Sequence, residues 1–251
     1  MRAEARLELP TRDELQTRRA EFIDTIRQNM LRKFGATVTT IGSMKKGDWD
    51  AFSDIDLWVS VPDEAKDELL ASRADVFADV GDDLVRWERP SFAPIDGIHS
   101  IVLYDSDEVA PVEVDYYISP ASQDEYYRDF IDCSESSTYD YTWAKGEDDK
   151  SAAARVDYSS LVTMWAGKYW HRGINPDEQL GWAWGRFEEV SDEIGMEHDL
   201  KPTATVADLT TIIDQYHSRA ILMRDSRRAR ACSKIADTLR LIELIETTRN
   251  Q

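Results

Sequence analysis

Two aspartates, Asp54 and Asp56, are separated by one residue in an apolar stretch with the composition of a β-strand. In an extended strand, side chains two residues apart point the same way, with Cα atoms roughly 6.6 Å apart. Carboxylates at that spacing can converge on two metal ions about 3.5 to 4 Å apart. Ile55 and Leu57 then face a core. The spacing predicts metal-assisted chemistry on the polar face of a strand.

A turn of a size that suits a phosphate group precedes these aspartates. Gly42 and Ser43 follow Ile41. Glycine lets the backbone approach a ligand closely, and a serine at a helix start offers its hydroxyl and N–H to an anion. Alone, the pair is more typical of a plain strand-to-helix turn, but the downstream acids favour a phosphate site. Lys45 and Lys46 are either phosphate ligands or, as such pairs more often are, a solvated helix face.

A second apolar run, residues 111–118, carries two further acids. Glu113 and Asp115 share one face of the strand that its composition predicts. If this strand lies beside the Asp54 strand, either acid completes a triad. Asp115 is favoured because its setting resembles that of Asp54 and Asp56, and Glu113 is then an acid on the rim of the cleft.

Clustered carboxylates repel one another, so without cations at least one keeps its proton to a higher pH than usual. A divalent cation removes this penalty. Magnesium prefers oxygen ligands and shares its coordination between carboxylates, waters and phosphates, and manganese can substitute for it.

With these motifs in order, the chain resembles the nucleotidyltransferase superfamily that includes the DNA polymerase beta-like enzymes. The superfamily signature is a hydrophobic residue with Gly-[Gly/Ser], a gap of about ten residues, Asp-hydrophobic-[Asp/Glu]-hydrophobic, and a later acidic strand. The matching segments are Ile41-Gly42-Ser43, Ser53-Asp54-Ile55-Asp56-Leu57 and Val114-Asp115. The resemblance implies an α/β (α+β) catalytic lobe with a mixed sheet, followed by a C-terminal α-helical bundle.

The resemblance also implies roles for single residues. Asp54, Asp56 and Asp115 would be the catalytic acids that bind the metals, and Asp115 would bind the catalytic metal or help to deprotonate the attacking hydroxyl. Gly42 and Ser43 would contact the beta or gamma phosphate. That hydroxyl would displace pyrophosphate from a nucleoside triphosphate, with positioning and charge neutralisation supplying most of the catalysis.

Lys168 lies near the end of a predicted helix beside Trp165, Tyr169, Trp170 and His171. Lysines from the helical lobe contact the triphosphate in related small-molecule nucleotidyltransferases, so Lys168 is a nucleotide-binding candidate. The equally favoured alternative is ordinary positive charge near a helix C-terminus. The aromatic residues are expected in the core rather than against a base, and His171 alone is expected to be structural.

The spacing of apolar residues predicts helices and strands in an order that suits two lobes. The expected elements are a helix over 12–34, strands over 36–41 and 54–61, a helix over 62–80, and a hairpin of 98–104 with 112–118. Helices follow over 152–172, 176–194, 206–216 and a last segment to about Thr248. We therefore expect a catalytic domain at 1–120, a linker at 121–150 and a helical domain at 151–251 that closes over the nucleotide or substrate.

The 251 residues carry a formal net charge of −19, which opposes generic binding to nucleic acids. Such acidity either attracts a cationic small acceptor or adapts the protein to a halophilic, high-salt cytoplasm. The second origin is favoured because Asp is abundant, Lys is scarce beside Arg, and the acids are scattered along the chain.

The sequence also indicates where the protein works. No apolar run approaches the roughly 20 residues that span a bilayer, and the N-terminus lacks the apolar segment of a secretory signal. Cys133 and Cys232 have no metal-like spacing, and the four histidines are isolated. We expect a cytoplasmic protein in a reducing compartment, without a membrane partner or a zinc site. The oligomeric state is open, a homodimer included.

The length and the helical second lobe make the chain most similar to the aminoglycoside and lincosamide nucleotidyltransferases. The expected function is transfer of a nucleoside monophosphate, with AMP from ATP favoured, to a hydroxyl of a small molecule. An aminoglycoside acceptor would imply a role in antibiotic resistance. The alternatives are a minimal nucleotidyltransferase of a toxin–antitoxin system that modifies a protein or transfer RNA, and a non-catalytic nucleotide-binding interaction module. The intact acids disfavour the module, and the acidic surface disfavours RNA.

Overall fold

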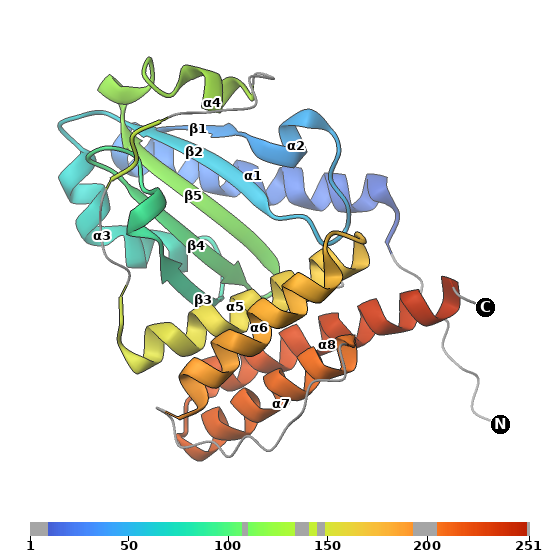
Figure 1. The fold of residues 1–251 in the computed structure, drawn as a ribbon. Coiled ribbons are helices and arrows are strands. Elements are labelled where there is room, and N and C mark those ends of the chain that lie inside the picture. The colour runs from blue at the N-terminus through green and yellow to red at the C-terminus, as the bar shows by residue number, and fades with distance from the viewer. Residues whose placement is uncertain (1–9, 107–109, 134–140, 145–148, 193–204, 250–251) are drawn as a thin grey trace.

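A mixed five-stranded sheet forms the centre of the chain, and helices cover both of its faces (Figure 1). The computed structural model describes residues 10–106, 110–133, 141–144, 149–192 and 205–249. The strands are β1 (Thr37–Thr40), β2 (Ile55–Val61), β3 (Asp83–Glu88), β4 (Ile98–Tyr104) and β5 (Val112–Pro120), in the spatial order β1-β2-β5-β4-β3. β2 and β5 are parallel, and the other neighbours are antiparallel. This sheet, with the helices that follow it, confirms the predicted fold class.

The helices largely follow the predicted ranges. They are α1 (Arg12–Phe34), α2 (Gly42–Lys46), α3 (Lys66–Ala78), α4 (Arg128–Asp132), α5 (Ala152–His171), α6 (Pro176–Ser191), α7 (Val206–Leu222) and α8 (Ser226–Arg249), with short 3-10 turns η1 (Pro90–Phe92) and η2 (Ala121–Gln123). The sequence prediction lacks β3, α4 and both turns, and it ends α7 too early. The predicted helix end at Ile194 lies outside the described residues. Within the described ranges, no helix has both the length and the apolar composition that a membrane span needs.

The long helix α1 begins and ends at signals that the sequence carries. Thr11 Oγ1 accepts a hydrogen bond from the Glu14 N–H, and the Glu14 carboxylate accepts one from the Thr11 N–H. Gly35 ends the helix in the left-handed conformation, with φ 65°. Ile26 and Met30 are fully buried on the face that packs toward the sheet. α1 is thus a fixed support behind the strands.

One face of the sheet is apolar and packs against α1 and α3. Leu57 of β2 and Val114 and Tyr116 of β5 are buried in this core. Phe77 of α3 stacks on Tyr116, with ring centroids 4.6 Å apart. Because successive side chains alternate across a strand, the residues between these core positions point to the opposite face.

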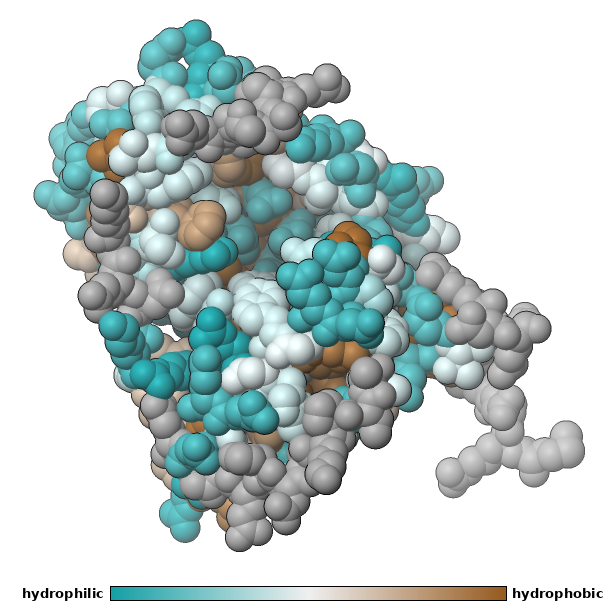
Figure 2. Space-filling view, viewed as in Figure 1, coloured by the Kyte–Doolittle hydropathy of each residue, from teal (hydrophilic) through white to brown (hydrophobic). Residues whose placement is uncertain are grey.

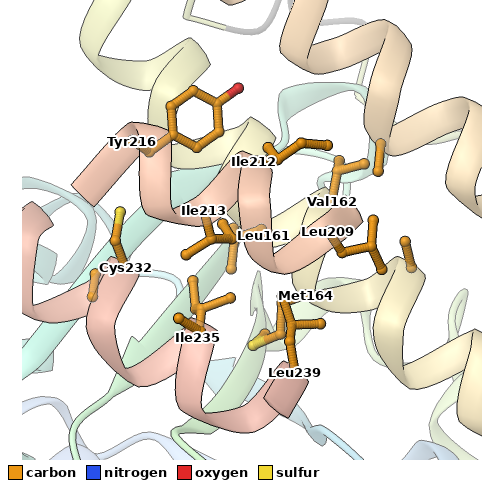
Figure 3. Close-up of a cluster of buried hydrophobic side chains, with 14 of the residues drawn as sticks. Leu161, Val162, Met164, Leu209, Ile212, Ile213, Tyr216, Cys232, Ile235 and Leu239 are labelled. Carbon is orange, nitrogen blue, oxygen red and sulfur yellow. The ribbon is translucent and has the colours of Figure 1, made fainter. Parts of the chain in front are cut away.

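The opposite face of the sheet meets the helical bundle of α5 to α8. Apolar side chains of these helices pack on one another, among them Leu161, Ile213 and Leu239 (Figure 3). Trp87 of β3 and Ile101 of β4 belong to the same buried cluster. The bundle and the sheet therefore share one core.

The described part of the 121–150 segment packs on the face of the sheet that meets the bundle, at the end that the bundle leaves uncovered. Trp58 of β2 donates a hydrogen bond from Nε1 to Asp124 at 2.9 Å, and its ring centroid lies 5.1 Å from that of Tyr127. Trp143 stacks on Tyr127 at 5.3 Å. The surface between the bundle and the top of the sheet is hollowed, and hydrophilic side chains lie in the hollow (Figure 2). The domain boundaries at residues 120 and 150 remain a prediction.

Candidate active site

The acids that the sequence predicts meet on the hollowed face of the sheet. Asp56 and Asp115 are direct partners in the parallel pairing of β2 with β5, an adjacency that the sequence prediction only assumes. Asp54, Glu113 and Asp115 each bring one carboxylate oxygen within 4.8 Å of the others. The acidic cluster therefore contains Asp54, Asp56, Glu113 and Asp115, one carboxylate more than the predicted triad.

Helix α2 lies directly against Asp56. Ile41 N–H donates to the Asp56 carbonyl at 2.9 Å, which holds the start of α2 beside β2. Gly42 has φ +64°, and a Cβ at this position would overlap Asp56 Oδ2. Both the backbone conformation and the close approach of the carboxylate therefore require glycine here. Ser43 follows, and its Oγ is buried with no hydrogen-bond partner among the described residues. A hydroxyl in that state suits an incoming polar group, so the triphosphate contact remains a prediction that this geometry fits.

Glu113 is buried, so the expectation that it lies on the rim of the cleft is wrong. It is 2% exposed, and helix α5 supplies donors to both of its oxygens. Trp165 Nε1 donates to Oε1 at 2.6 Å, and Lys168 Nζ donates to Oε2 at 2.5 Å. Lys168 is itself 5% exposed. Its nearest anion in the structure is thus Glu113, and its contact with a triphosphate remains a prediction.

The cluster has fewer positive charges than carboxylates. Burial raises the pKa of Asp56 well above its usual range, and the charges of Asp54 and Asp115 raise it further. Burial also raises the pKa of Asp115, followed by the charge of Glu113. Lys168 opposes the rise for both aspartates. A set of carboxylate oxygens with one buried lysine among them has the chemistry of a divalent-cation site.

The orphaned oxygen of Asp115 fits that chemistry. Asp115 Oδ1 is buried and has no hydrogen-bond partner among the described residues, whereas both oxygens of Glu113 accept hydrogen bonds. Asp115 is therefore the acid of β5 with a free ligand atom. The residues present fit magnesium or manganese held by oxygen ligands.

A buried histidine beside Asp115 is absent from the sequence prediction. His99 of β4 places Nε2 3.3 Å from Asp115 Oδ2, and its ring stacks on Tyr117 with centroids 4.2 Å apart. Burial lowers the pKa of His99 to about 3, followed by the effect of the Arg89 charge. The imidazole is therefore neutral at pH 7 and can donate from Nε2 to the carboxylate. The hairpin register, which pairs His99 with Tyr117, is the signal that places it here.

The loop that leads into Asp54 is held by two arginines. Arg172, after the end of α5, donates to the two oxygens of Asp50 at 2.8 and 3.0 Å. Arg19 of α1 donates to the Ser53 carbonyl at 2.9 Å. Burial raises the pKa of Asp50, but the hydrogen bonds and charge of Arg172, together with hydrogen bonds from Phe52 and Ser53, outweigh burial and lower it to about 2. Neither arginine is predicted from the sequence, because each acts through a contact distant in the chain.

The remaining candidates lie away from the acids or pack in the core. Lys45 donates to the Ile131 carbonyl at 2.7 Å, toward α4, and Lys46 is exposed. Trp170 packs against the bundle core as expected. His171 Nδ1 lies 2.9 Å from Glu246 Oε1, which agrees with the structural role predicted for it.

One family model matches part of the chain. Residues 23–136 match the family model described as nucleotidyltransferase domain. No curated protein matches the chain. The chain is similar to a solved structure of the Cid1 poly(U) polymerase, with 15% identity and a TM-score of 0.30, over 62% of this chain and 42% of that one. It thus spans less than half of that protein.

Two further solved structures show similar values. The GLD-2/RNP-8 complex has 13% identity and a TM-score of 0.34, over 83% of this chain and 71% of that one. An aminoglycoside 6-adenyltransferase from Bacillus subtilis has 12% identity and a TM-score of 0.29, over 90% of this chain and 95% of that one. TM-scores of 0.29 to 0.34 show only a distant likeness between these structures and this chain.

Proposed function

We propose that this chain, which carries a nucleotidyltransferase domain over residues 23–136, transfers a nucleoside monophosphate from a nucleoside triphosphate to a hydroxyl of a small molecule. The observation that carries the proposal is the pairing of Asp56 with Asp115 in a cluster whose one buried lysine already bonds Glu113. Such a cluster binds cations that come from outside the chain. Phosphate oxygens of a triphosphate are the natural second set of ligands for those cations.

Asp54, Asp56 and Asp115 would hold magnesium, or manganese in its place. When bound, the metal ions neutralise charge on the phosphates and polarise the phosphorus toward attack. Glu113 would stay a fixed neighbour, because its oxygens already accept hydrogen bonds from Trp165 and Lys168. The buried Asp115 Oδ1 would then gain the partner that it lacks.

The chain's own residues position both reactants. Gly42 lets the backbone reach the phosphates, and the Ser43 hydroxyl donates to a phosphate oxygen. The acceptor oxygen bonds to the α-phosphorus while the bond to the bridging oxygen of pyrophosphate breaks. Asp115 orients the acceptor hydroxyl and helps to remove its proton, with His99 steadying the carboxylate at 3.3 Å. AMP from ATP is the transferred group that we favour, and the cytoplasm is the proposed location.

A mass-shift screen tests this function. The protein is incubated with magnesium, each nucleoside triphosphate in turn, and a panel of hydroxylated metabolites and antibiotics that includes aminoglycosides. The expected result is one acceptor that gains a nucleoside monophosphate while pyrophosphate appears. Asp56→Asn should abolish the product, whereas Asp75→Asn, exposed on α3 behind the sheet, should not. Absence of magnesium-dependent binding of any triphosphate would refute the proposal.

A further inference from the structure

Arg89 lies on the same face of the sheet as the acidic cluster, and the proposed reaction gives it no role. It follows β3, and its N–H donates to the His99 carbonyl at 2.9 Å, which continues the pairing of Glu88 with Ser100. Arg89 therefore lies on the same face as His99, next to it on the neighbouring strand. Its guanidinium stacks over the exposed ring of Phe92, 3.8 Å from the centroid.

Arg89 differs from the other two cations near the acids. Lys168 is bonded to Glu113, and Arg172 is bonded to both oxygens of Asp50. No carboxylate pairs with Arg89 in the described part of the chain, and its side chain is partly exposed. In a protein with 49 acidic and 30 basic residues, an arginine that pairs with no acid among the described residues is conspicuous.

The positive charge of Arg89 reaches the acidic cluster. After burial, it is the next largest cause that lowers the pKa of the His99 imidazole. It also counteracts the rise that burial and Glu113 cause in the pKa of Asp115. The charge of the guanidinium thus acts on His99 and Asp115, while the guanidinium itself lies over the ring of Phe92.

Arg89 is on the opposite side of the acids from the predicted triphosphate contacts. Gly42 and Ser43 are beside β2, and Arg89 follows β3, which is separated from β2 by β5 and β4. Three strand spacings amount to roughly 14 Å. In-line displacement puts the attacking oxygen and the leaving pyrophosphate on opposite sides of the phosphorus. If the triphosphate binds at α2, the acceptor therefore lies on the other side of the acids, over β4 and β3.

We infer that Arg89 binds an anionic group of the acceptor, so that the natural acceptor is a hydroxylated small molecule bearing a phosphate or a carboxylate. This inference rests on the proposed nucleotidyl transfer and narrows its acceptor. A guanidinium presents a planar pair of donors that matches either anion. The same charge repels an ammonium group of an aminoglycoside that lies beside it. Phe92 adds an apolar wall beside the anion.

Calorimetric titration of anions tests the inference without knowledge of the full acceptor. The protein is first saturated with magnesium and the α,β-methylene analogue of ATP, which fills the triphosphate site and cannot be cleaved. Inorganic phosphate and acetate are then titrated separately, to distinguish a phosphate from a carboxylate. The variants are Arg89→Gln, Arg89→Lys and, as a matched control on the far face of the sheet, Arg32→Gln.

We expect saturable millimolar binding of at least one anion to the wild type and to Arg32→Gln. Arg89→Gln should weaken it by about tenfold or more, and Arg89→Lys by less, because lysine keeps the charge but loses the paired donors. The analogue should bind Arg89→Gln as tightly as it binds the wild type. Absence of anion binding to the wild type, equal binding to Arg89→Gln, or loss of analogue binding in that variant would overturn the assignment. Failure of the proposed function itself appears earlier, as absence of magnesium-dependent binding of the analogue.

Discussion

Asp157 in the helical bundle and Asp115 on the sheet are both buried carboxylates, with 4% and 8% of their surface exposed, but their surroundings differ in charge. Asp157 accepts hydrogen bonds from Arg228 at 2.7 and 2.9 Å, and Arg227 approaches at 3.3 Å. Burial raises the pKa of Asp157, and the arginines oppose that rise. Asp115 instead has Glu113 and Asp54 beside it, whose charges add to the effect of burial.

This difference distinguishes a carboxylate that the chain neutralises from the carboxylates of the proposed site. Where the chain supplies the cations, the carboxylate links two helices. Where it provides too few, the carboxylates destabilise the protein by mutual repulsion until a cation arrives from outside. The same chain thus contains a buried acid that its own arginines neutralise and an acidic cluster that could hold a metal ion.

The largest effect expected from this contrast is on turnover. Asp56→Asn and Asp115→Asn should each lower pyrophosphate release by about a thousandfold or more, because each removes a metal ligand. Neither should lower the melting temperature without magnesium, since each removes one repelling charge. Asp115→Asn should reduce kcat more than it weakens nucleotide binding. Near-normal turnover of both variants at saturating magnesium would contradict the assignment, and loss of kcat in Glu113→Gln alone would transfer the role to Glu113.

Asp157→Asn should show the opposite pattern. The change removes the charge from hydrogen bonds with Arg228 and Arg227, so the free energy of unfolding should fall by about 2 kcal/mol. Turnover per folded molecule should stay normal. Urea unfolding followed by circular dichroism measures the loss. Asp214→Asn, which breaks an exposed pair with Arg240, is the matched control and should cost under about 0.5 kcal/mol. Equal losses in the two variants would show that burial of the pair does not matter.

Magnesium should raise the melting temperature only where the acidic cluster is intact. At ten times its dissociation constant, a bound ion adds about 1.4 kcal/mol to the free energy of unfolding. Thermal melts with and without magnesium should show this gain for the wild type and for Asp157→Asn, but much less for Asp56→Asn. The buffers with and without magnesium have the same ionic strength and contain no calcium, so that a difference in melting temperature reports magnesium binding rather than charge screening. A gain that is the same in all three proteins would mean that the ion binds elsewhere.

The smallest expected effect concerns Asp50, another carboxylate that the chain neutralises itself. Its folded pKa of about 2 lies below the unfolded value, so its pair with Arg172 stabilises the fold above about pH 4 and loses this contribution as the pH falls toward 2. Because the Asp50 side chain is 39% exposed, solvent screening limits the contribution to about 1 kcal/mol. Asp50→Asn should therefore flatten the acid limb of the stability curve. An unchanged slope between pH 4 and 2 would argue against the pair.

The sequence predicted the parts of the site that depend on local pattern. Asp56 lies in β2 and Asp54 directly precedes that strand, as the local pattern suggests, and Gly42 is required where α2 meets Asp56. The prediction that Asp56 and Asp115 lie together depended on one assumption, that the two acidic strands are neighbours, and the structure shows that they are. These features involve residues close together in sequence or a single strand pairing.

What the sequence could not predict depends on packing between distant segments. The strand pattern alone does not distinguish Glu113 from Asp115, because the donors to Glu113, Trp165 and Lys168, come from α5, about 50 residues later. β3 is short, and its alternation of apolar and polar residues covers only Val85 to Glu88, because the register shifts between Asp83 and Val85. The polar 121–150 stretch was interpreted as a linker, yet its aromatic side chains pack on Trp58.

Helix α5 limits which segments of this protein can be exchanged for those of another. Near its C-terminal end it carries Trp165 and Lys168, which bond Glu113, and Arg172 just beyond it bonds the loop before Asp54. A chimaera joined between sheet and bundle would receive a foreign helix at these contacts and leave Glu113 as a buried charge without its donors. If the proposed transfer is right, acceptor specificity should change more easily through substitutions around Arg89 and Phe92, which leave α5 intact, than through exchange of the whole helical half.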